Sequence, residues 1–263
     1  MAHSTLVNRI ARTAAVAGIS LLAAAPARAT SLISNGDFSA GNTGFTSGYS
    51  YNTINPGPEL VEGAYSVVTQ ASDVHAAWGG YYDHTSGDSS GKYFVANASS
   101  DTSQTVWQSS LITVGQANTP YRFEAWLTKI YPYESNPPLL SFQIGDGTTW
   151  TNLGETASLD DANPGEWVFA YADGQFTSAG QYYVRLKNSN GASGGNDLGL
   201  DDVYFGLRSE APSVGITPGV ATPQSFSPQG VPEIDPAGLG SVAALVTGVL
   251  GLLERRRLKR CAA

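Results

Sequence analysis

Short segments in which apolar and polar residues alternate recur through the middle of this 263-residue chain. A period of two residues is typical of strands that have one buried and one exposed face. Turn-forming residues such as Asn163-Pro164-Gly165 and Asn190-Gly191 separate these segments. The clearest segments are 64–70, 92–97, 105–114, 121–130, 139–144, 166–172, 182–187 and 198–205, and a short apolar stretch at 32–38 precedes them.

The fold class follows from this pattern. No part of the middle region has a sustained helical period, and Tyr, Trp, Val and Thr are frequent in it. These features predict an all-β domain over residues 30–207, an antiparallel jelly-roll β-sandwich. Residues 208–230 are rich in Pro, Ser, Gly and Thr and poor in bulky apolar residues, which predicts a flexible linker.

Two apolar runs lie outside the alternating region. The first, 14–25, follows Arg9 and Arg12 and precedes the small residues of 27–29, so residues 1–29 predict a cleaved secretory signal peptide rather than a lasting anchor. The second, 237–253, carries no charge and is near the lower length limit for a transmembrane helix. A buried C-terminal helix is the alternative, although the run has no polar stripe. The basic cluster in 255–260 predicts a cytoplasmic end.

The order of motif, apolar run and basic cluster in 231–263 resembles the PEP-CTERM sorting signal of Gram-negative bacteria. Ile234 stands where the usual motif has its second proline. The resemblance implies an exosortase-type membrane enzyme as a partner, transient retention in the inner membrane, and delivery to the cell envelope or extracellular matrix. The residues of the sorting motif are Val231, Pro232, Glu233, Ile234, Asp235 and Pro236.

Charge and cysteine content narrow the possible partners of the exported part. Residues 30–230 contain nineteen acidic and six basic side chains, a net charge of −13 with His neutral. Such a charge repels nucleic acid, whereas neutral polysaccharides and divalent cations are not repelled. The only cysteine, Cys261, lies in the basic tail, so the domain has neither a disulfide nor thiol chemistry.

The segments NGDFSAGNTGF, beginning at Asn35, and NDLGLDDVYFG, ending at Gly206, resemble the first and last strands of galactose-binding-like carbohydrate-binding modules. The region from Val74 to Gly87 and the later Trp107 look like the domain that often accompanies this sorting signal. The resemblance implies a non-catalytic sandwich, commonly with a structural Ca²⁺ held by oxygen ligands. The candidate ligands are Asp37, Asp88, Asp201 and Asp202. The alternative is that such aspartates close turns through local hydrogen bonds.

Strand alternation also indicates where a sugar could bind. A sugar ring stacks on an aromatic side chain while its hydroxyls bind polar groups, so both kinds must share one exposed sheet surface. If their strands are neighbours, five outward-facing residues would form one such platform for exopolysaccharide. They are Trp126, Arg122, Gln143, Tyr183 and Arg185. In the alternative, loops cover this face and Trp126 belongs to a second small core.

Catalysis has the weakest support in the sequence. The exported part contains only His75 and His84, and no serine in a nucleophile-elbow pattern accompanies them. Paired carboxylates of a glycoside hydrolase could come from Glu124, Glu155 and Glu166. We therefore expect a non-enzymatic protein that binds exopolysaccharide. A structural matrix protein without glycan recognition and a secreted glycoside hydrolase are the alternatives.

Overall fold

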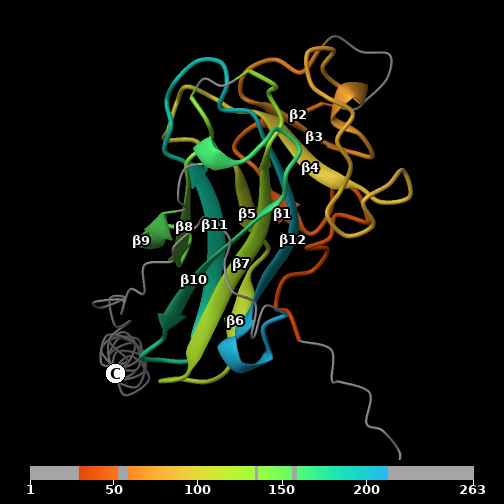
Figure 1. Ribbon diagram of the computed structural model, residues 1–263. Coiled ribbons are helices and arrows are strands. Elements are labelled where there is room, and N and C mark those ends of the chain that lie inside the picture. The colour runs from red at the N-terminus through yellow and green to blue at the C-terminus, as the bar shows by residue number, and fades with distance from the viewer. Residues whose placement is uncertain (1–29, 53–58, 134–135, 156–158, 213–263) are drawn as a thin grey trace, which may run out of the picture.

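The computed structural model describes residues 30–52, 59–133, 136–155 and 159–212, which form two β-sheets (Figure 1). The strands are β1 (Phe45–Thr46), β2 (Ser50–Tyr51), β3 (Ala64–Val68), β4 (Tyr93–Asn97), β5 (Trp107–Ser109), β6 (Ile112–Val114), β7 (Pro120–Lys129), β8 (Leu140–Gly145), β9 (Trp150–Glu155), β10 (Val168–Gln175), β11 (Gly180–Asn188) and β12 (Leu198–Leu207). Helices in these ranges are three short 3₁₀ turns: η1 (Ala71–Asp73), η2 (Leu159–Asp161) and η3 (Arg208–Glu210). The all-β prediction is confirmed.

The two sheets have different strand orders. Sheet A runs β1-β5-β11-β8-β9, with β6 also paired to β11, and sheet B runs β10-β7-β12-β4-β3-β2. Neighbouring strands are antiparallel except β2 and β3, which pair in parallel. A parallel pair needs a long connection, and the chain from Asn52 to Gly63 provides it. The purely antiparallel arrangement that we expected is therefore corrected at this edge.

The main core fills the space between the sheets. Phe123 and Leu127 face inward from β7, while Phe142 and Ile144 face inward from β8, and all four are buried. The rings of Phe123 in sheet B and Phe142 in sheet A meet edge to face, with centroids 4.8 Å apart. Burial of such aromatic rings is a large source of stability in a small domain. The inward positions are those that the period of two predicted.

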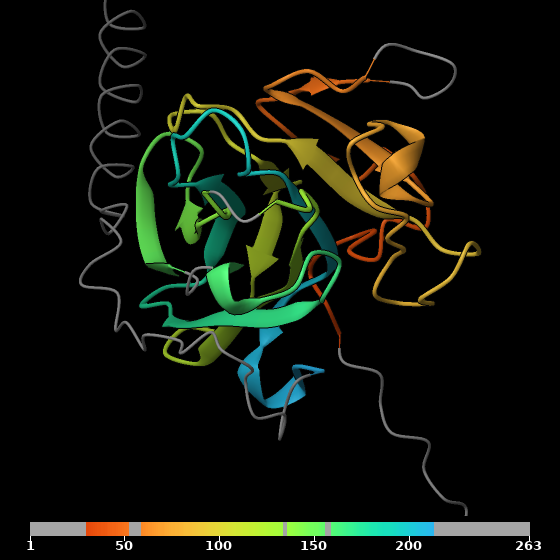
Figure 2. The ribbon, with the colours of Figure 1, turned by 45° about the horizontal axis from the view of Figure 1, so that its top comes forward.

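A second core lies on the outer face of sheet B. Leu60, Ala71 and Trp78 pack there against Tyr93 and Val95 of β4. Figure 2 shows the segment that carries them, in orange, beside β3 and β4 and away from sheet A. This layer hides part of one outer face of the sandwich, whereas sheet A has no comparable second cluster of buried apolar residues within the described ranges.

Three local features differ from the expected strands. The stretch 32–38 is not a strand, although the N–H of Leu32 donates to the carbonyl of Phe205 in β12. Asn35 and Phe38 have positive φ values of 56° and 50°, which are incompatible with a continuous strand. The segment 105–114 is divided into β5 and β6, which both pair with β11. Strand β9 was not predicted, because its apolar and polar residues do not alternate regularly. In the structure, a register shift interrupts its pairing with β8.

The predicted signal peptide (1–29) and sorting signal (231–263) lie outside the described residues, as does most of the predicted linker. Within the described ranges, none of the helices has the length and apolar character needed to cross a membrane.

Candidate functional site

The five residues of the expected sugar platform lie on two different surfaces. Strand β7 pairs with β10 and β12 in sheet B, whereas β8 pairs with β9 and β11 in sheet A. Arg122 and Trp126 therefore lie on the outer face of sheet B, and Gln143, Tyr183 and Arg185 lie on the outer face of sheet A. The main core separates the two groups. Alternation gave the correct outward positions, but it contains no information about which strands are neighbours.

Arg122 has a structural environment. Its side chain is buried, with 8% exposed, and Nε and Nη2 donate to the two carboxylate oxygens of Asp173 at 2.7 and 3.0 Å. The guanidinium also lies 3.9 Å from the centre of the Tyr171 ring. A bidentate ion pair of this kind has defined geometry, so Arg122 joins β7 to the edge strand β10. It is not presented to a ligand.

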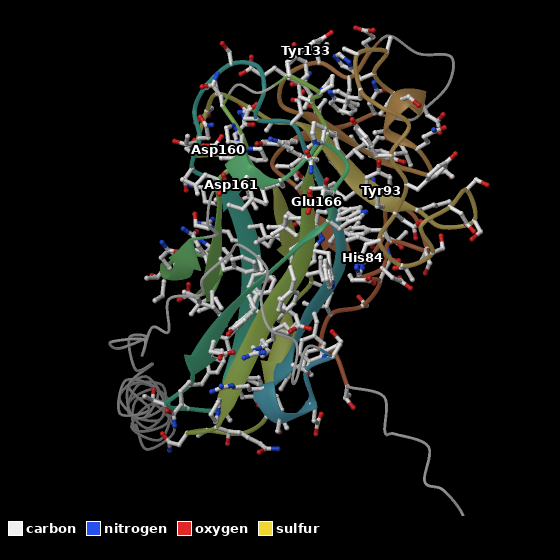
Figure 3. The ribbon with its side chains drawn as sticks, in the orientation of Figure 1. His84, Tyr93, Tyr133, Asp160, Asp161 and Glu166 are labelled. Carbon is white, nitrogen blue, oxygen red and sulfur yellow. The ribbon has the colours of Figure 1, made fainter. Side chains whose placement is uncertain are left out.

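Trp126 lies under a loop. The imidazole of His84 stacks on its ring at a centroid distance of 3.8 Å and an angle of 16°, and Phe169 packs beside it at 5.3 Å. Nδ1 of His84, which is labelled in Figure 3, is 2.6 Å from a carboxylate oxygen of Asp202. This contact holds the imidazole in place. This geometry corresponds to the alternative in which loops cover the outer face and Trp126 belongs to a secondary packing cluster.

Asp201 and Asp202 fasten this loop to β12. The buried carboxylate of Asp201 accepts hydrogen bonds from the backbone N–H groups of His84 and Thr85 at 2.8 and 3.2 Å. Burial, with a smaller contribution from the charge of Asp202, raises the pKa of Asp201 to about 8. Asp202 has φ of 46° and lies where the β12–β7 register shifts. A bulge here points both carboxylates at the loop.

The other two candidate calcium ligands serve their own turns. Asp37 accepts from the backbone N–H and hydroxyl of Ser39 at 3.2 and 2.9 Å, and Asp88 accepts from the N–H of Ser90 at 2.7 Å. In the part of the chain that the structure describes, no three His, Cys, Asp or Glu side chains lie close enough together to hold a metal ion. Asp37 and Asp88 thus have local hydrogen-bonding roles, whereas Asp201 and Asp202 bind a loop that is distant in the sequence. Calcium binding stays a prediction.

The remaining candidates for catalysis are dispersed. His75 stacks on Trp78 at 4.8 Å, with Nε2 3.8 Å from a carboxylate oxygen of Glu59. Glu166 accepts from the backbone and side-chain nitrogens of Asn163 at 3.0 and 2.8 Å, which closes a turn before β10. Glu124 is buried on the outer face of sheet B. The contacts of His75 and Glu166 explain these two residues without a catalytic role.

The outer face of sheet A gathers aromatic and hydrogen-bonding side chains. Arg185 is opposite Gln143 in the strand register, and Gly145 lies between Tyr183 on one side and Trp150 on the other. All the larger side chains of this surface are half-buried, so they are supported by the sheet and still reach solvent. We call this surface the sheet A face and define it by Gln108, Gln143, Trp150, Tyr183, Arg185 and Lys187.

Trp150 is the central residue of the sheet A face. The guanidinium of Arg185 lies 3.7 Å from the centre of its ring, and Nε of Arg185 donates to Oε1 of Gln143 at 2.7 Å. Gly145 leaves room for the indole, because a Cβ there would come within 2.9 Å of Trp150 Cδ2. Sequence reasoning missed Trp150, since its strand lacks regular alternation. The only sequence signal was a tryptophan shortly after a Gly-rich turn.

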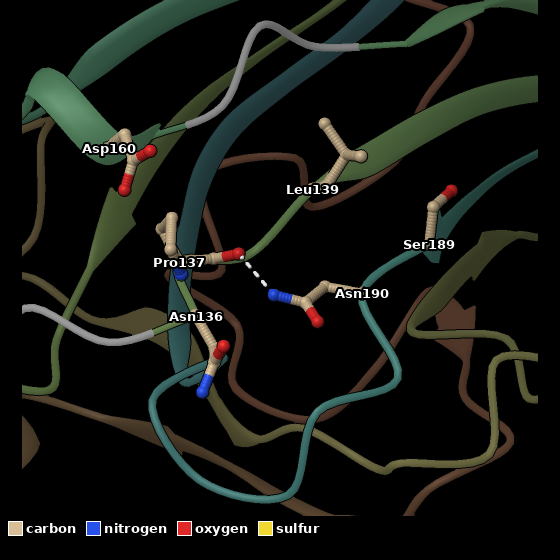
Figure 4. A pocket seen from close by; sticks show the side chains of 6 residues that line it. All are labelled: Asn136, Pro137, Leu139, Asp160, Ser189 and Asn190. Atoms are coloured by element: carbon tan, nitrogen blue, oxygen red, sulfur yellow. Dashed lines mark hydrogen bonds between the residues drawn. The ribbon is translucent and has the colours of Figure 1, made fainter.

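A shallow pocket of about 480 Å³ lies at one end of the sandwich, between the β7–β8 and β11–β12 loops (Figure 4). It is lined by Asn136, Pro137, Leu139, Asp160, Ser189 and Asn190. The amide nitrogens of Asn190 and Asn136 donate to backbone carbonyls of Pro137 and Gly194 at 2.8 and 3.4 Å. These amides hold the loops together, so we place the candidate site on the sheet A face.

No protein-family model and no curated protein matches this chain. Among solved structures, TmCBM61 in complex with β-1,4-galactotriose is similar at 12% identity, over 68% of this chain and 99% of that one, with a TM-score of 0.41. The C-terminal family 22 carbohydrate-binding module of Clostridium thermocellum Xyn10B is similar at 11% identity, over 66% of this chain and 93% of that one, with a TM-score of 0.40. The C-terminal domain of EclA, a sugar-binding protein, is similar at 21% identity, over 39% of this chain and 66% of that one, with a TM-score of 0.31.

Proposed function

We propose that this is an exported protein of the cell envelope or extracellular matrix, with a non-catalytic β-sandwich of jelly-roll type that binds exopolysaccharide. The sequence at the two ends of the chain supports export and processing. The order of motif, apolar run and basic residues in 231–263 favours processing by an exosortase-type enzyme, and residues 1–29 favour export. A structural calcium ion remains part of the proposal.

The observation that carries glycan binding is the construction of the sheet A face. Trp150 and Tyr183 supply aromatic surface on either side of Gly145, and Arg185 and Gln143 supply hydrogen-bonding groups that are already oriented by their mutual bond. Sugars need this combination of a flat apolar surface and fixed polar groups. Because the side chains rest on strands, little ordering is required when a ligand binds.

The test is the affinity of the full-length protein, kept in mild detergent because of its apolar C-terminal run, for a broad polysaccharide panel. We expect saturable binding that Trp150→Ala weakens at least about tenfold, because buried aromatic anchors carry much of the energy of an interface. Tyr133→Ala is the matched control. Tyr133 is 67% exposed and belongs to the β7–β8 loop, away from the sheet A face (Figure 3).

Two results would contradict this account. If the folded wild-type protein binds no member of the panel, the chain is a structural matrix protein without glycan recognition, an alternative favoured by the covering of Trp126. If Tyr133→Ala removes binding and Trp150→Ala does not, the glycan binds at the loop end of the sandwich. An unfolding midpoint close to that of the wild type must accompany each variant.

A further inference from the structure

Positive charge is concentrated in sheet A. The exported part has only six basic residues, and two of them, Arg185 and Lys187, face outward from β11 at alternate positions. The six strands of sheet A contain a single acidic residue, Glu155, although residues 30–230 contain nineteen. This surface is therefore a basic area on a strongly acidic protein.

Elsewhere in the described part of the chain, basic side chains are engaged by acidic residues or point to solvent. Arg122 and Arg208 both pair with Asp173, and Nζ of Lys129 donates to the backbone oxygen of Asp160. In contrast, the contacts of Arg185 in that part are with the neutral side chains of Gln143, Thr105 and Trp150. No ion pair joins Arg185 or Lys187 to a described carboxylate.

Asp146 and Asp101, two carboxylates near the sheet A face, have hydrogen-bond partners of their own. Asp146, in the β8–β9 turn, accepts from the backbone N–H groups of Thr148 and Thr149 at 2.8 and 2.7 Å. Asp101 acts on Lys187 electrostatically, but partial burial and the charge of Arg185 have larger effects and lower the pKa of Lys187. Two partly desolvated cations thus lie together, and no described carboxylate forms an ion pair with either of them, which is a favourable arrangement for an anionic ligand.

We propose that the sheet A face binds an acidic glycan, with Arg185 and Lys187 contacting the carboxylate groups of uronic acid units; this rests on the proposed glycan-binding function of the same face. Trp150 and Tyr183 contact the sugar rings. The bond from Nε of Arg185 to Gln143 orients the planar guanidinium, which suits a carboxylate better than a flexible ammonium does. The ammonium of Lys187 adds a second positive charge two positions along β11.

The net negative charge of the protein does not prevent this contact. Exposed charges more than about 8 Å apart are largely screened at physiological ionic strength, whereas cations in direct contact with a carboxylate act at short range. The acidic remainder of the surface still opposes a densely charged polyanion such as nucleic acid. A local basic area in an acidic surface therefore favours a glycan with one carboxylate on each uronic acid unit over a more densely charged polymer such as nucleic acid.

The experiment compares acidic polymers with their own neutral derivatives. Full-length protein is titrated with polygalacturonate, alginate and hyaluronan, and with the carboxyl-reduced form of each, in which the carboxylates have become hydroxymethyl groups. We expect at least one acidic polymer to bind, and its reduced form to bind at least about tenfold more weakly, as loss of a charge-assisted contact requires.

Variants assign the preference to the two residues. Arg185→Gln and Lys187→Gln, tested separately, should each bring the affinity for the acidic polymer toward that for its reduced form. Arg185→Lys should retain part of the difference because it keeps the charge. Lys92→Gln removes one positive charge from an exposed position before β4 and should leave the affinity unchanged. If Arg185→Gln does not fold, Lys187→Gln still tests the proposal.

The outcomes separate this inference from the proposed function. Equal binding of acidic and reduced polymers, lost in Trp150→Ala, would overturn the acidic preference and leave glycan binding intact. Equal weakening by Lys92→Gln and Lys187→Gln would show an effect of overall charge and overturn the assignment to this face. Absence of binding to any polymer by the folded protein would overturn both proposals.

Discussion

At the scale of single residues, a buried carboxylate determines how one loop lies on sheet B. Asp201 accepts two backbone N–H groups from a loop more than a hundred positions earlier in the chain, and Asp202 holds His84 over Trp126. Because burial raises the pKa of Asp201 to about 8, the folded protein retains a proton there that the unfolded chain releases near pH 4. The side chain therefore links folding to pH.

We predict that Asp201→Asn makes stability less dependent on pH. Since the folded state binds more protons than the unfolded state between about pH 4 and 8, the contribution of Asp201 is greatest below this window and is lost as the pH rises through it, by at most about 1.4 kcal/mol per pH unit. The measurement is urea unfolding of both proteins from pH 5 to 9. If the free energy of unfolding changes with pH in the same way in wild type and variant, Asp201 is not the source of the pH dependence, because Asp202 and His84 remain in both proteins.

At the scale of elements, the β8–β9 hairpin places Trp150 on the sheet A face. The hairpin closes with a bond from the N–H of Asp146 to the carbonyl of Thr149, and Gly147 has a positive φ of 96° in the turn. Gly145 is opposite Trp150 and leaves the space that the indole occupies. The tryptophan depends on this hairpin for its position, so small changes in the hairpin should alter binding.

We predict that Gly145→Ala lowers both stability and glycan affinity. The added methyl group would overlap the carbonyl oxygen of Thr149 and press on the Trp150 ring, and overpacking of this kind commonly costs about 1–3 kcal/mol. Gly115→Ala is the control, because no atom lies within 4 Å of a Cβ built there. Unfolding midpoints and affinities measured at a temperature where all proteins are folded provide the test. Wild-type affinity in Gly145→Ala would show that the position of Trp150 is unimportant.

The sequence was informative about faces and uninformative about neighbours. A period of two identified Gln143, Tyr183 and Arg185 as outward, because alternation is a local property of a strand. The expected platform failed because it required β7 beside β8 or β11, and strand pairing depends on contacts far apart in the sequence. Trp150 was missed for a related reason. Its neighbours Gly145 and Arg185 come from other strands, so its setting exists only in the assembled sheet.

At the scale of the whole molecule, the two outer faces of the sandwich are used differently. Loops cover much of sheet B, where Trp78 and Tyr93 belong to a second core and His84 lies over Trp126. Sheet A leaves Trp150, Arg185 and their neighbours half-exposed. We infer that one face stabilises the domain and the other binds the ligand, while the two ends of the chain direct export and sorting.

The most direct test of this division is oxidative footprinting of the full-length protein with and without the polysaccharide that it binds best. Our account predicts that the glycan protects Trp150 and Tyr183 on the sheet A face, and leaves the oxidation of Trp126 and Tyr133 unchanged. Protection of Tyr133 without protection of Trp150 would place the ligand at the loop end of the sandwich and contradict the central claim.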